Sequence, residues 1–320
     1  MRGTWKRRSS LPVAVSEVGV GVVDDVIHVV GGTEKGGEGP TAAASTLHLA
    51  YDPRSDRWDR RAPLPIAMSH VGVVGLDGRL YAFGGLGRNV HLEPKNAALA
   101  YLPEADRWEA LPPFSSPRGG VTAAAVNGKI HIFGGRNSSK VIRISPPDAP
   151  EVLAGVGTVN THEVFDPRTA SWSEALPLPG PPRDHAGIAV LNGKIHVFGG
   201  RINDYSDMLD RHDVYDPVTG SWSSGAALPR PRSAGAFAVL DDLIIYAGGE
   251  CKPGGKPFTA NAFEDVTGYD AKTDQWLTLT SLPEGRHAFG AGTVGGVAYF
   301  AGGALLCGGG SSTDLLTLTL

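Results

Sequence analysis

Side chains that can transfer protons near neutral pH recur at one place in this sequence, shortly before pairs of adjacent glycines. Glu17, His70 and His185 stand at equivalent positions, two residues beyond a row found by counting sixteen residues back from each pair. Asp184 and His287 occupy the position just before theirs in their own copies. Carboxylates and imidazoles are common acids and bases in enzymes. These five residues are therefore the candidate catalytic groups, although no complete catalytic constellation is visible.

The row sixteen residues back contains four arginines. Four guanidinium groups at equivalent places would make a cationic ring for an anionic ligand. Alternatively, each arginine pairs with a nearby backbone group or carboxylate as part of the repeat, and this structural alternative is favoured because the residue recurs with the repeat. The four are Arg118, Arg183, Arg232 and Arg286, and we retain them as candidate ligand-binding residues.

Polar residues that follow the glycine pairs complete the predicted binding surface. Loops on a rigid scaffold often carry function, so we expect the cluster as a whole to bind a ligand. For any single member, a solvated place in the polar rim is the favoured role. With one serine from before the inner strands, the set is Arg88, Asn89, Arg136, Asn137, Arg201, Asn203, Asp204, Ser233 and Glu250.

Metal binding is a weaker alternative. Cys251 and Cys307 follow the glycine pairs of neighbouring repeats, so they could approach each other or His287. A metal site that uses these cysteines with His70, His185 or His287, a disulfide, and two unrelated thiols all remain open, and unrelated thiols are favoured. No cofactor is predicted, and a metal is not excluded.

The elements that position these residues form six copies of one unit. Glycine pairs follow apolar runs such as HVVGG, which ends at Gly32, and turn signals such as Asn127-Gly128 stand just before these runs. Asn-Gly and Asp-Gly accept the positive φ angles of tight hairpins. A third strand ends in Tyr-Asp-Pro or a variant, and a fourth strand carries a Trp seven residues after that Tyr, as in Tyr51 and Trp58. Each unit is therefore a four-stranded antiparallel meander that needs its neighbours to bury its faces.

The two ends of the sequence complement each other. The sixth unit stops at Leu320 without a fourth strand, whereas residues 3–12 supply a fourth strand with Trp5 and no first three. Joining them closes the ring and removes an open sheet edge. We therefore predict one all-β domain over residues 1–320. It is a six-bladed β-propeller whose last blade is closed by the N-terminal strand.

The glycine pairs, the Tyr-Asp-Pro, the Trp and the Pro-Arg before the next inner strand together resemble the Kelch repeat. The resemblance covers essentially the whole chain, with departures such as Leu102 for the Asp and Ala271 for the Pro. Kelch proteins include ubiquitin-ligase adaptors, sialic acid epimerases, copper-dependent galactose oxidases and iron-dependent plant specifier proteins. The resemblance therefore implies a fold and leaves the activity open.

Six other histidines have structural positions in this repeat. Three stand three residues before a glycine pair, where two other units have Tyr81 and Tyr299, and three lie in or near third strands. We expect all of them to be packing residues. They are His28, His131 and His196 in the first group, and His48, His162 and His212 in the second.

Composition excludes several function classes. The formal net charge of −4 provides no positive field for nucleic acid or anionic membranes. No apolar run approaches the length of a membrane span, and no export signal is evident. We expect a cytoplasmic monomer.

Three functions remain. The first is a stand-alone propeller that binds a small anionic molecule or a protein segment where the glycine-pair loops surround the central channel. The second is an enzyme at the same face, a sugar-acid epimerase, isomerase or lyase, in which Arg holds a carboxylate while Glu17 or a His moves a proton. The third and weakest is a His/Cys metalloenzyme.

Overall fold

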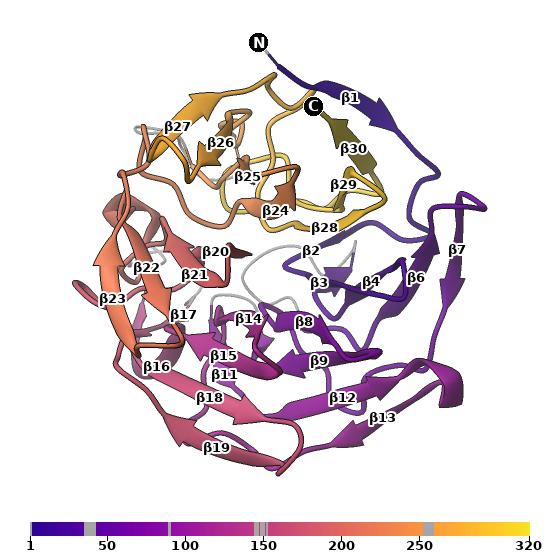
Figure 1. Ribbon diagram of the computed structural model, residues 1–320. Helices are drawn as coiled ribbons and strands as arrows, with labels where there is room; N and C mark the ends of the chain where they lie inside the picture. Colours follow the sequence, from indigo (N-terminus) through magenta and orange to yellow (C-terminus); the bar gives the residue numbers. More distant parts are fainter. Residues whose placement is uncertain are drawn as a thin grey trace.

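Each glycine pair lies directly after the second strand of a four-stranded antiparallel sheet. In the computed structural model, six such sheets surround one axis as the blades of a propeller, with their first strands innermost (Figure 1). The structure describes residues 2–34, 43–88, 91–143, 147, 151, 153–251 and 259–320. The predicted all-β, six-bladed architecture is confirmed.

The blades follow the order of the sequence. The first blade consists of β3 Gly19–Val23, β4 Val26–Val30, β6 His48–Asp52 and β7 Arg57–Arg60. The second consists of β8 Gly72–Leu76, β9 Arg79–Phe83, β12 Ala98–Leu102 and β13 Arg107–Ala110. The third consists of β14 Thr122–Val126, β15 Lys129–Phe133, β18 His162–Asp166 and β19 Ser171–Glu174. The fourth blade consists of β20 Gly187–Leu191, β21 Lys194–Phe198, β22 His212–Asp216 and β23 Ser221–Ser224. The fifth consists of β24 Ala236–Leu240, β25 Leu243–Ala247, β26 Val266–Asp270 and β27 Gln275–Thr278. The sixth is β28 Gly290–Val294, β29 Val297–Ala301, β30 Leu315–Thr319 and β1 Thr4–Arg7.

Smaller elements lie in the connections on the side of the glycine pairs. Three two-stranded sheets pair β2 Val15–Ser16 with β5 Thr33–Glu34, β10 Leu86–Arg88 with β11 Leu92–Pro94, and β16 Arg136–Arg143 with β17 Leu153–Thr158. The helical elements described are two short 3-10 turns, η1 Pro103–Ala105 and η2 Tyr205–Asp207. None of the described residues forms a helix long and apolar enough to cross a lipid bilayer.

The sixth blade closes as predicted. Strand β1 pairs antiparallel with β30, so Trp5 lies opposite Leu318. Figure 1 shows these two strands side by side although they come from opposite ends of the sequence. The pairing completes a four-stranded blade and covers the edge that β30 would otherwise expose.

The repeated tryptophans join each blade to its neighbour. The indole Nε1 of Trp108 donates to the carbonyl oxygen of Ala62, which follows the last strand of the preceding blade, at 3.0 Å. Each of the other five tryptophans donates in the same way to a carbonyl oxygen of the preceding blade. The pairs are Trp5–Thr280, Trp58–Ser9, Trp172–Pro112, Trp222–Leu176 and Trp276–Ala226. This recurring bond between blades explains why the fourth strand keeps a Trp.

The row of arginines belongs to the scaffold. The guanidinium of Arg118 donates to Glu163 Oε2 at 2.5 Å, and that of Arg183 donates to Asp213 Oδ2 at 2.6 Å. Their acceptors lie on the third strand of the same blade, and all four arginine side chains are buried. Arg232 donates to Thr267 and the Gly248 carbonyl, and Arg286 to Asp314 and the Gly302 carbonyl. Partners inside each blade engage these groups, which supports the favoured structural alternative for Arg118, Arg183, Arg232 and Arg286.

The six other histidines are structural, as expected, and they form pairs. His28 Nδ1 lies 2.9 Å from His48 Nε2, across the second and third strands of the first blade. The Nδ1 atom of His48 in turn hydrogen-bonds the Ala62 carbonyl oxygen at 3.1 Å. The same arrangement joins His131 to His162 and His196 to His212. These imidazoles are buried within the blades, away from the axis.

Candidate functional site

Six residues at the start of the inner strands form a closed ring of backbone hydrogen bonds around the axis. Each has a positive φ, between 52° and 64°, which a non-glycine residue adopts only at some cost. The amide of each donates to the carbonyl oxygen of the equivalent residue in the blade before it, over 2.8 to 3.2 Å. We call this the amide ring, and its members are Glu17, His70, Gly120, His185, Ala234 and Ala288.

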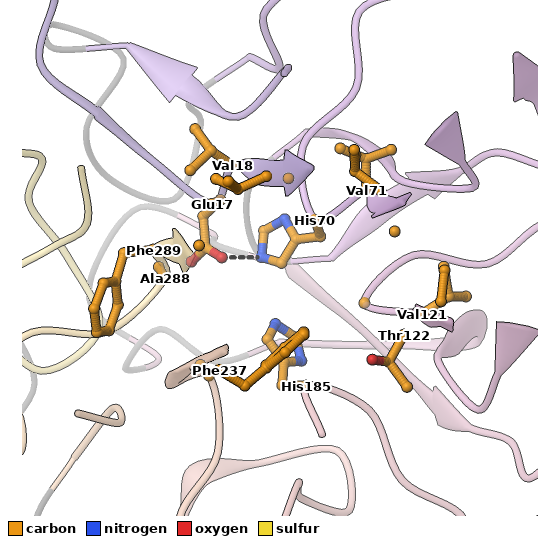
Figure 2. Close-up of a pocket in the computed structure, with 18 of the residues that line it drawn as sticks. Glu17, Val18, His70, Val71, Val121, Thr122, His185, Phe237, Ala288 and Phe289 are labelled. Carbon is orange, nitrogen blue, oxygen red and sulfur yellow. Dashed lines mark ion pairs between the residues drawn. The ribbon is translucent and has the colours of Figure 1, made fainter. Parts of the chain in front are cut away.

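The amide ring brings three of the predicted residues together. In Figure 2 the side chains of Glu17, His70 and His185 converge on one point near the axis. Glu17 Oε2 lies 3.0 Å from His70 Nε2, and the His70 and His185 rings lie 5.2 Å apart between centroids. The sequence register placed these residues at equivalent positions because each blade starts its inner strand at the same distance from its glycine pair.

An axial channel of about 120 Å³ ends at these side chains. It extends from the amide ring along the inner strands toward their hairpin turns, between apolar side chains that include Val20, Val73, Ala123 and Phe237. The polar groups therefore lie where the sequence predicted them, but the cavity that reaches them lies on the opposite side of the ring from the glycine-pair loops. The sequence prediction placed the site among the glycine-pair loops, whereas this cavity lies on the other side of the ring.

Asp184 and Arg201 anchor a buried ionic network behind the ring. Asp184 Oδ2 accepts a hydrogen bond from Arg136 Nε at 2.5 Å, and its Oδ1 lies 2.9 Å from His185 Nδ1. Arg201 forms an ion pair with Glu250 and approaches Asp184 Oδ1 at 3.5 Å. Burial opposes ionisation of Asp184, but His185, Arg136 and Arg201 together hold its pKa well below the usual range. Asp184 therefore stays a carboxylate.

Burial makes two of the imidazoles near the axis, His185 and His287, poor bases. Burial and then the charge of Arg201 lower the pKa of His185 to about 4. Burial also lowers the pKa of His287 to about 4, although Glu17 partly opposes the shift. Glu17 keeps a pKa below its usual value despite its own burial, because His70 lies beside it. At neutral pH, His185 and His287 are therefore uncharged beside an ionised Glu17.

Buried carboxylates and guanidinium groups form one cluster behind and at the amide ring. Among the residues that the structure describes, Asp184 and Glu250 pair with Arg136 and Arg201, and Glu17 pairs with His70. Buried charges are costly unless they are paired and hydrogen-bonded, so these groups depend on one another.

His91 completes the cluster and was missed by the sequence analysis. Its ring lies 5.1 Å from the His70 ring and 5.3 Å from the His185 ring, between centroids. It sits in the turn between β10 and β11, in the same loop as Arg88, and not at a position set by the count from the glycines. Its place in a polar loop after a glycine pair was the available signal.

The long loop after the third glycine pair holds His91 in place. It forms the β16–β17 arm, in which Ser138 Oγ donates to the His91 carbonyl oxygen. A side chain at Gly155 would place its Cβ 2.2 Å from the same oxygen, so only glycine allows this approach. Arg136 secures the arm by donating to the Gly155 and Asn203 carbonyl oxygens.

The remaining predicted ligand residues separate into structural and peripheral groups. Asn203 Oδ1 accepts the amides of Gly157 and Thr158, and Asp204 accepts the Ser206 amide at the start of η2. Arg88 pairs with Glu93 on the surface, while Asn137 accepts the Ser139 amide in the arm. Ser233 is buried, and its hydroxyl has no partner among the described residues. Asn89 lies outside the described residues.

Cys251 and Cys307 form a disulfide, with Cα atoms 4.7 Å apart. The prediction of unrelated thiols is therefore wrong, and neither sulfur is a free metal ligand. The bond joins the loops after the fifth and sixth glycine pairs and lies next to Glu250 in the sequence. It thus tethers the loop whose carboxylate pairs with Arg201.

A grouping of possible metal ligands also differs from the one predicted. His287 lies beside Glu250, with Nε2 4.0 Å from Oε1, and not with the other two predicted histidines. His70, His91 and His185 instead offer one ligand atom each, all within 4.8 Å of one another. We call these three residues the histidine triad.

Comparisons with known proteins agree with the repeat pattern. The Kelch motif matches residues 67–115 and 182–229. The chain is 26% identical over 298 residues to the Kelch-like protein terF of Aspergillus terreus, a span of 90% of this chain and 60% of that protein. It is 28% identical over 198 residues to Kelch-like protein 35 of Mus musculus, covering 62% of this chain and 21% of that protein. The chain therefore spans 60% or less of the length of these relatives.

A solved structure supports the fold. The structure of YjhT superposes with a TM-score of 0.77 at 19% identity, covering 98% of this chain and 97% of that one. At this identity the likeness concerns the arrangement of blades. It carries no information about what binds at the axis.

Proposed function

Because the chain belongs to the Kelch-repeat family of β-propellers, which typically serve as protein-binding or ligand-binding domains, we propose that it binds a small molecule in the axial channel. The body of the ligand packs against the apolar walls, and a hydroxyl or amino group donates a hydrogen bond to Glu17. This assignment replaces the small anionic ligand as the favoured partner.

One observation carries the proposal: an ionised carboxylate lies at the amide-ring end of a cavity whose other walls are mostly apolar. The side chain of Glu17 is 19% exposed, whereas that of Asp184 is fully covered and that of Glu250 is 9% exposed. Glu17 is thus the acceptor most open to an incoming group. A hydrogen bond to a charged acceptor contributes about 1.5 to 3 kcal/mol.

The size of the channel restricts the ligand. A cavity of about 150 Å³ with apolar walls admits benzene, and the axial channel has about 120 Å³. The channel is smaller than that cavity, so a single six-membered ring with one small polar substituent is the upper limit of ligand size. A protein segment is too large for this volume, and a segment bound to the outer loops would not reach Glu17.

The same geometry disfavours the sugar-acid enzyme. That mechanism needs a guanidinium that is available to hold a substrate carboxylate. Among the described residues near the axis, Arg136 and Arg201 are already engaged by Asp184 and Glu250, and the arginine row is used inside the blades. An anionic substrate would also meet the ionised carboxylate of Glu17 in the channel.

Phenol and toluene test the proposal, because they have nearly the same shape and differ in one hydroxyl group. We expect isothermal titration to show that phenol binds at least about tenfold more tightly than toluene, in line with one hydrogen bond to a carboxylate. Glu17→Gln should remove most of this preference. The matched control is Glu93→Gln, which changes a surface carboxylate paired with Arg88 and should leave the preference intact.

A second variant distinguishes the channel from other surfaces. Ala123→Leu adds volume to the channel wall and should abolish the binding of both probes while the protein remains folded. Equal affinities for phenol and toluene in the wild type, or binding that survives Ala123→Leu, would contradict the proposal.

A further inference from the structure

The histidine triad places three imidazoles around one point next to the channel. His70 and His185 come from the amide ring in the second and fourth blades, and His91 comes from the β10–β11 turn. Their ring centroids lie 5.1, 5.2 and 5.3 Å apart, so the three rings form a nearly equilateral arrangement.

From this geometry we infer that the histidine triad binds a divalent transition-metal ion of the zinc class. Imidazole nitrogens are typical ligands of Zn²⁺, Co²⁺, Ni²⁺ and Cu²⁺, and three histidines with one open position are a recurring zinc arrangement. The fourth position would face Glu17 and the channel. The inference does not depend on the ligand proposed for that channel.

Arg201 shows where the lone pairs point. Its Nη2 atom lies 3.3 Å from His91 Nε2 and 3.4 Å from His185 Nε2. A guanidinium can donate hydrogen bonds but cannot accept them. Both Nε2 atoms therefore present lone pairs to the same cationic group, which is the arrangement that a metal ion needs.

The groups behind the imidazoles are those that commonly orient metal ligands. His185 Nδ1 lies 2.9 Å from Asp184 Oδ1, and His70 Nδ1 lies 2.9 Å from Ser69 Oγ. A carboxylate or hydroxyl at the second ring nitrogen fixes the orientation of the ligand nitrogen. His91 is fixed through its backbone, by Ser138 and by the close approach of Gly155.

The distances require a modest contraction. The ligand atoms now lie within 4.8 Å of one another, whereas tetrahedral zinc–nitrogen bonds of about 2.05 Å give separations of about 3.3 Å. The contraction would be a rotation of the three side chains, and it would replace the present contact of 3.0 Å between His70 Nε2 and Glu17 Oε2 with a bond to the metal. Arg201 would withdraw its Nη2 and keep its partners Glu250 and Asp184.

Cobalt titration of the full chain tests the inference. After removal of metals with a chelator, we expect one equivalent of Co²⁺ to produce the intense visible absorption of a four-coordinate site. Zn²⁺ should displace it one for one. His91→Ala should weaken Co²⁺ binding at least tenfold, because it removes one ligand and leaves the amide ring unchanged.

Two further variants make the test specific. His287→Ala removes a buried axial histidine outside the triad and should bind Co²⁺ like the wild type. Arg201→Gln removes the competing guanidinium and should bind Co²⁺ at least tenfold more tightly. No absorption in the wild type, or equal losses in His91→Ala and His287→Ala, would overturn the inference and leave the phenol measurement unaffected.

Discussion

Trp5 of β1 lies opposite Leu318 of β30, and its indole donates to the Thr280 carbonyl oxygen of the fifth blade. Its ring also contacts Phe300, with centroids 5.1 Å apart. One residue therefore joins the first strand, the last strand and the neighbouring blade.

Trp5→Ala should destabilise the ring closure. The substitution removes a partly buried aromatic ring and a hydrogen bond between blades, so we expect the free energy of unfolding to fall by about 2 to 4 kcal/mol. Urea denaturation followed by circular dichroism measures it. Val218→Ala is the control, because Val218 is 83% exposed and should not change the midpoint. A midpoint shared by both variants would show that β1 contributes little to closure.

Arg118→Met tests the structural role of the arginine row. It leaves the Glu163 carboxylate buried with the Ser115 amide as its remaining hydrogen-bond donor among the described residues. Breaking a buried ion pair costs about 3 to 5 kcal/mol. The double variant Arg118→Met/Glu163→Met should recover much of this loss in a double-mutant cycle. If the Arg118→Met protein is folded but binds phenol more weakly, Arg118 contributes to ligand binding and its role is not only structural.

The histidine pairs predict acid sensitivity. In the folded protein, burial lowers the pKa of His28 and His131 to about 3, and that of His48, His162 and His196 to about 4. In the unfolded chain each has a pKa of about 6.5, so the unfolded state binds more protons below that pH. The free energy of unfolding should therefore fall as pH decreases from about 6.5 to about 4. Each histidine contributes up to about 1.4 kcal/mol per pH unit.

A matched variant isolates this effect. His28→Tyr/His48→Ala gives the first blade the residues that the second blade has at the same positions, Tyr81 and Ala98. Urea denaturation at several pH values should show a shallower dependence of stability on pH than in the wild type. An unchanged slope would mean that these pairs do not control the acid response.

Removing the disulfide should lower stability. Cys251 and Cys307 are 56 residues apart in sequence, and a cross-link of this kind contributes about 2 to 4 kcal/mol. Cys251→Ser/Cys307→Ser should therefore melt at a lower temperature, and the reduced wild type should behave like the variant. Two reactive thiols in denatured, unreduced protein would contradict the assignment. Because disulfides persist in oxidising compartments, the native thiol state also tests the expected cytoplasmic location.

The sequence allowed the fold to be predicted because each element repeats its own signals. Hairpin dipeptides, glycine pairs and tryptophans recur at the same spacing in the repeats. A departure from the pattern in one repeat therefore does not change the predicted fold. The same register located Glu17, His70, Asp184 and His185 at the axis, since the start of each inner strand is fixed relative to its glycine pair.

The parts that the sequence did not reveal depend on contacts between different blades. The position of His91 depends on a loop that Gly155 and Ser138 hold from the third blade. The count from the glycine pairs placed Arg118 near the axis but could not show that Glu163 occupies its guanidinium. The disulfide and the direction of the channel likewise follow from the packing of loops that have no repeated pattern.

The amide ring separates the mechanical role of six positions from their chemical role. All six adopt nearly the same backbone conformation and exchange the same hydrogen bonds, whether the residue is Glu17, His70 or Ala234. New reactive groups at Ala234 or Ala288 would therefore point into the existing cavity without altering how the blades assemble. The side chains at the axis can therefore be substituted one at a time while the backbone of the ring stays the same.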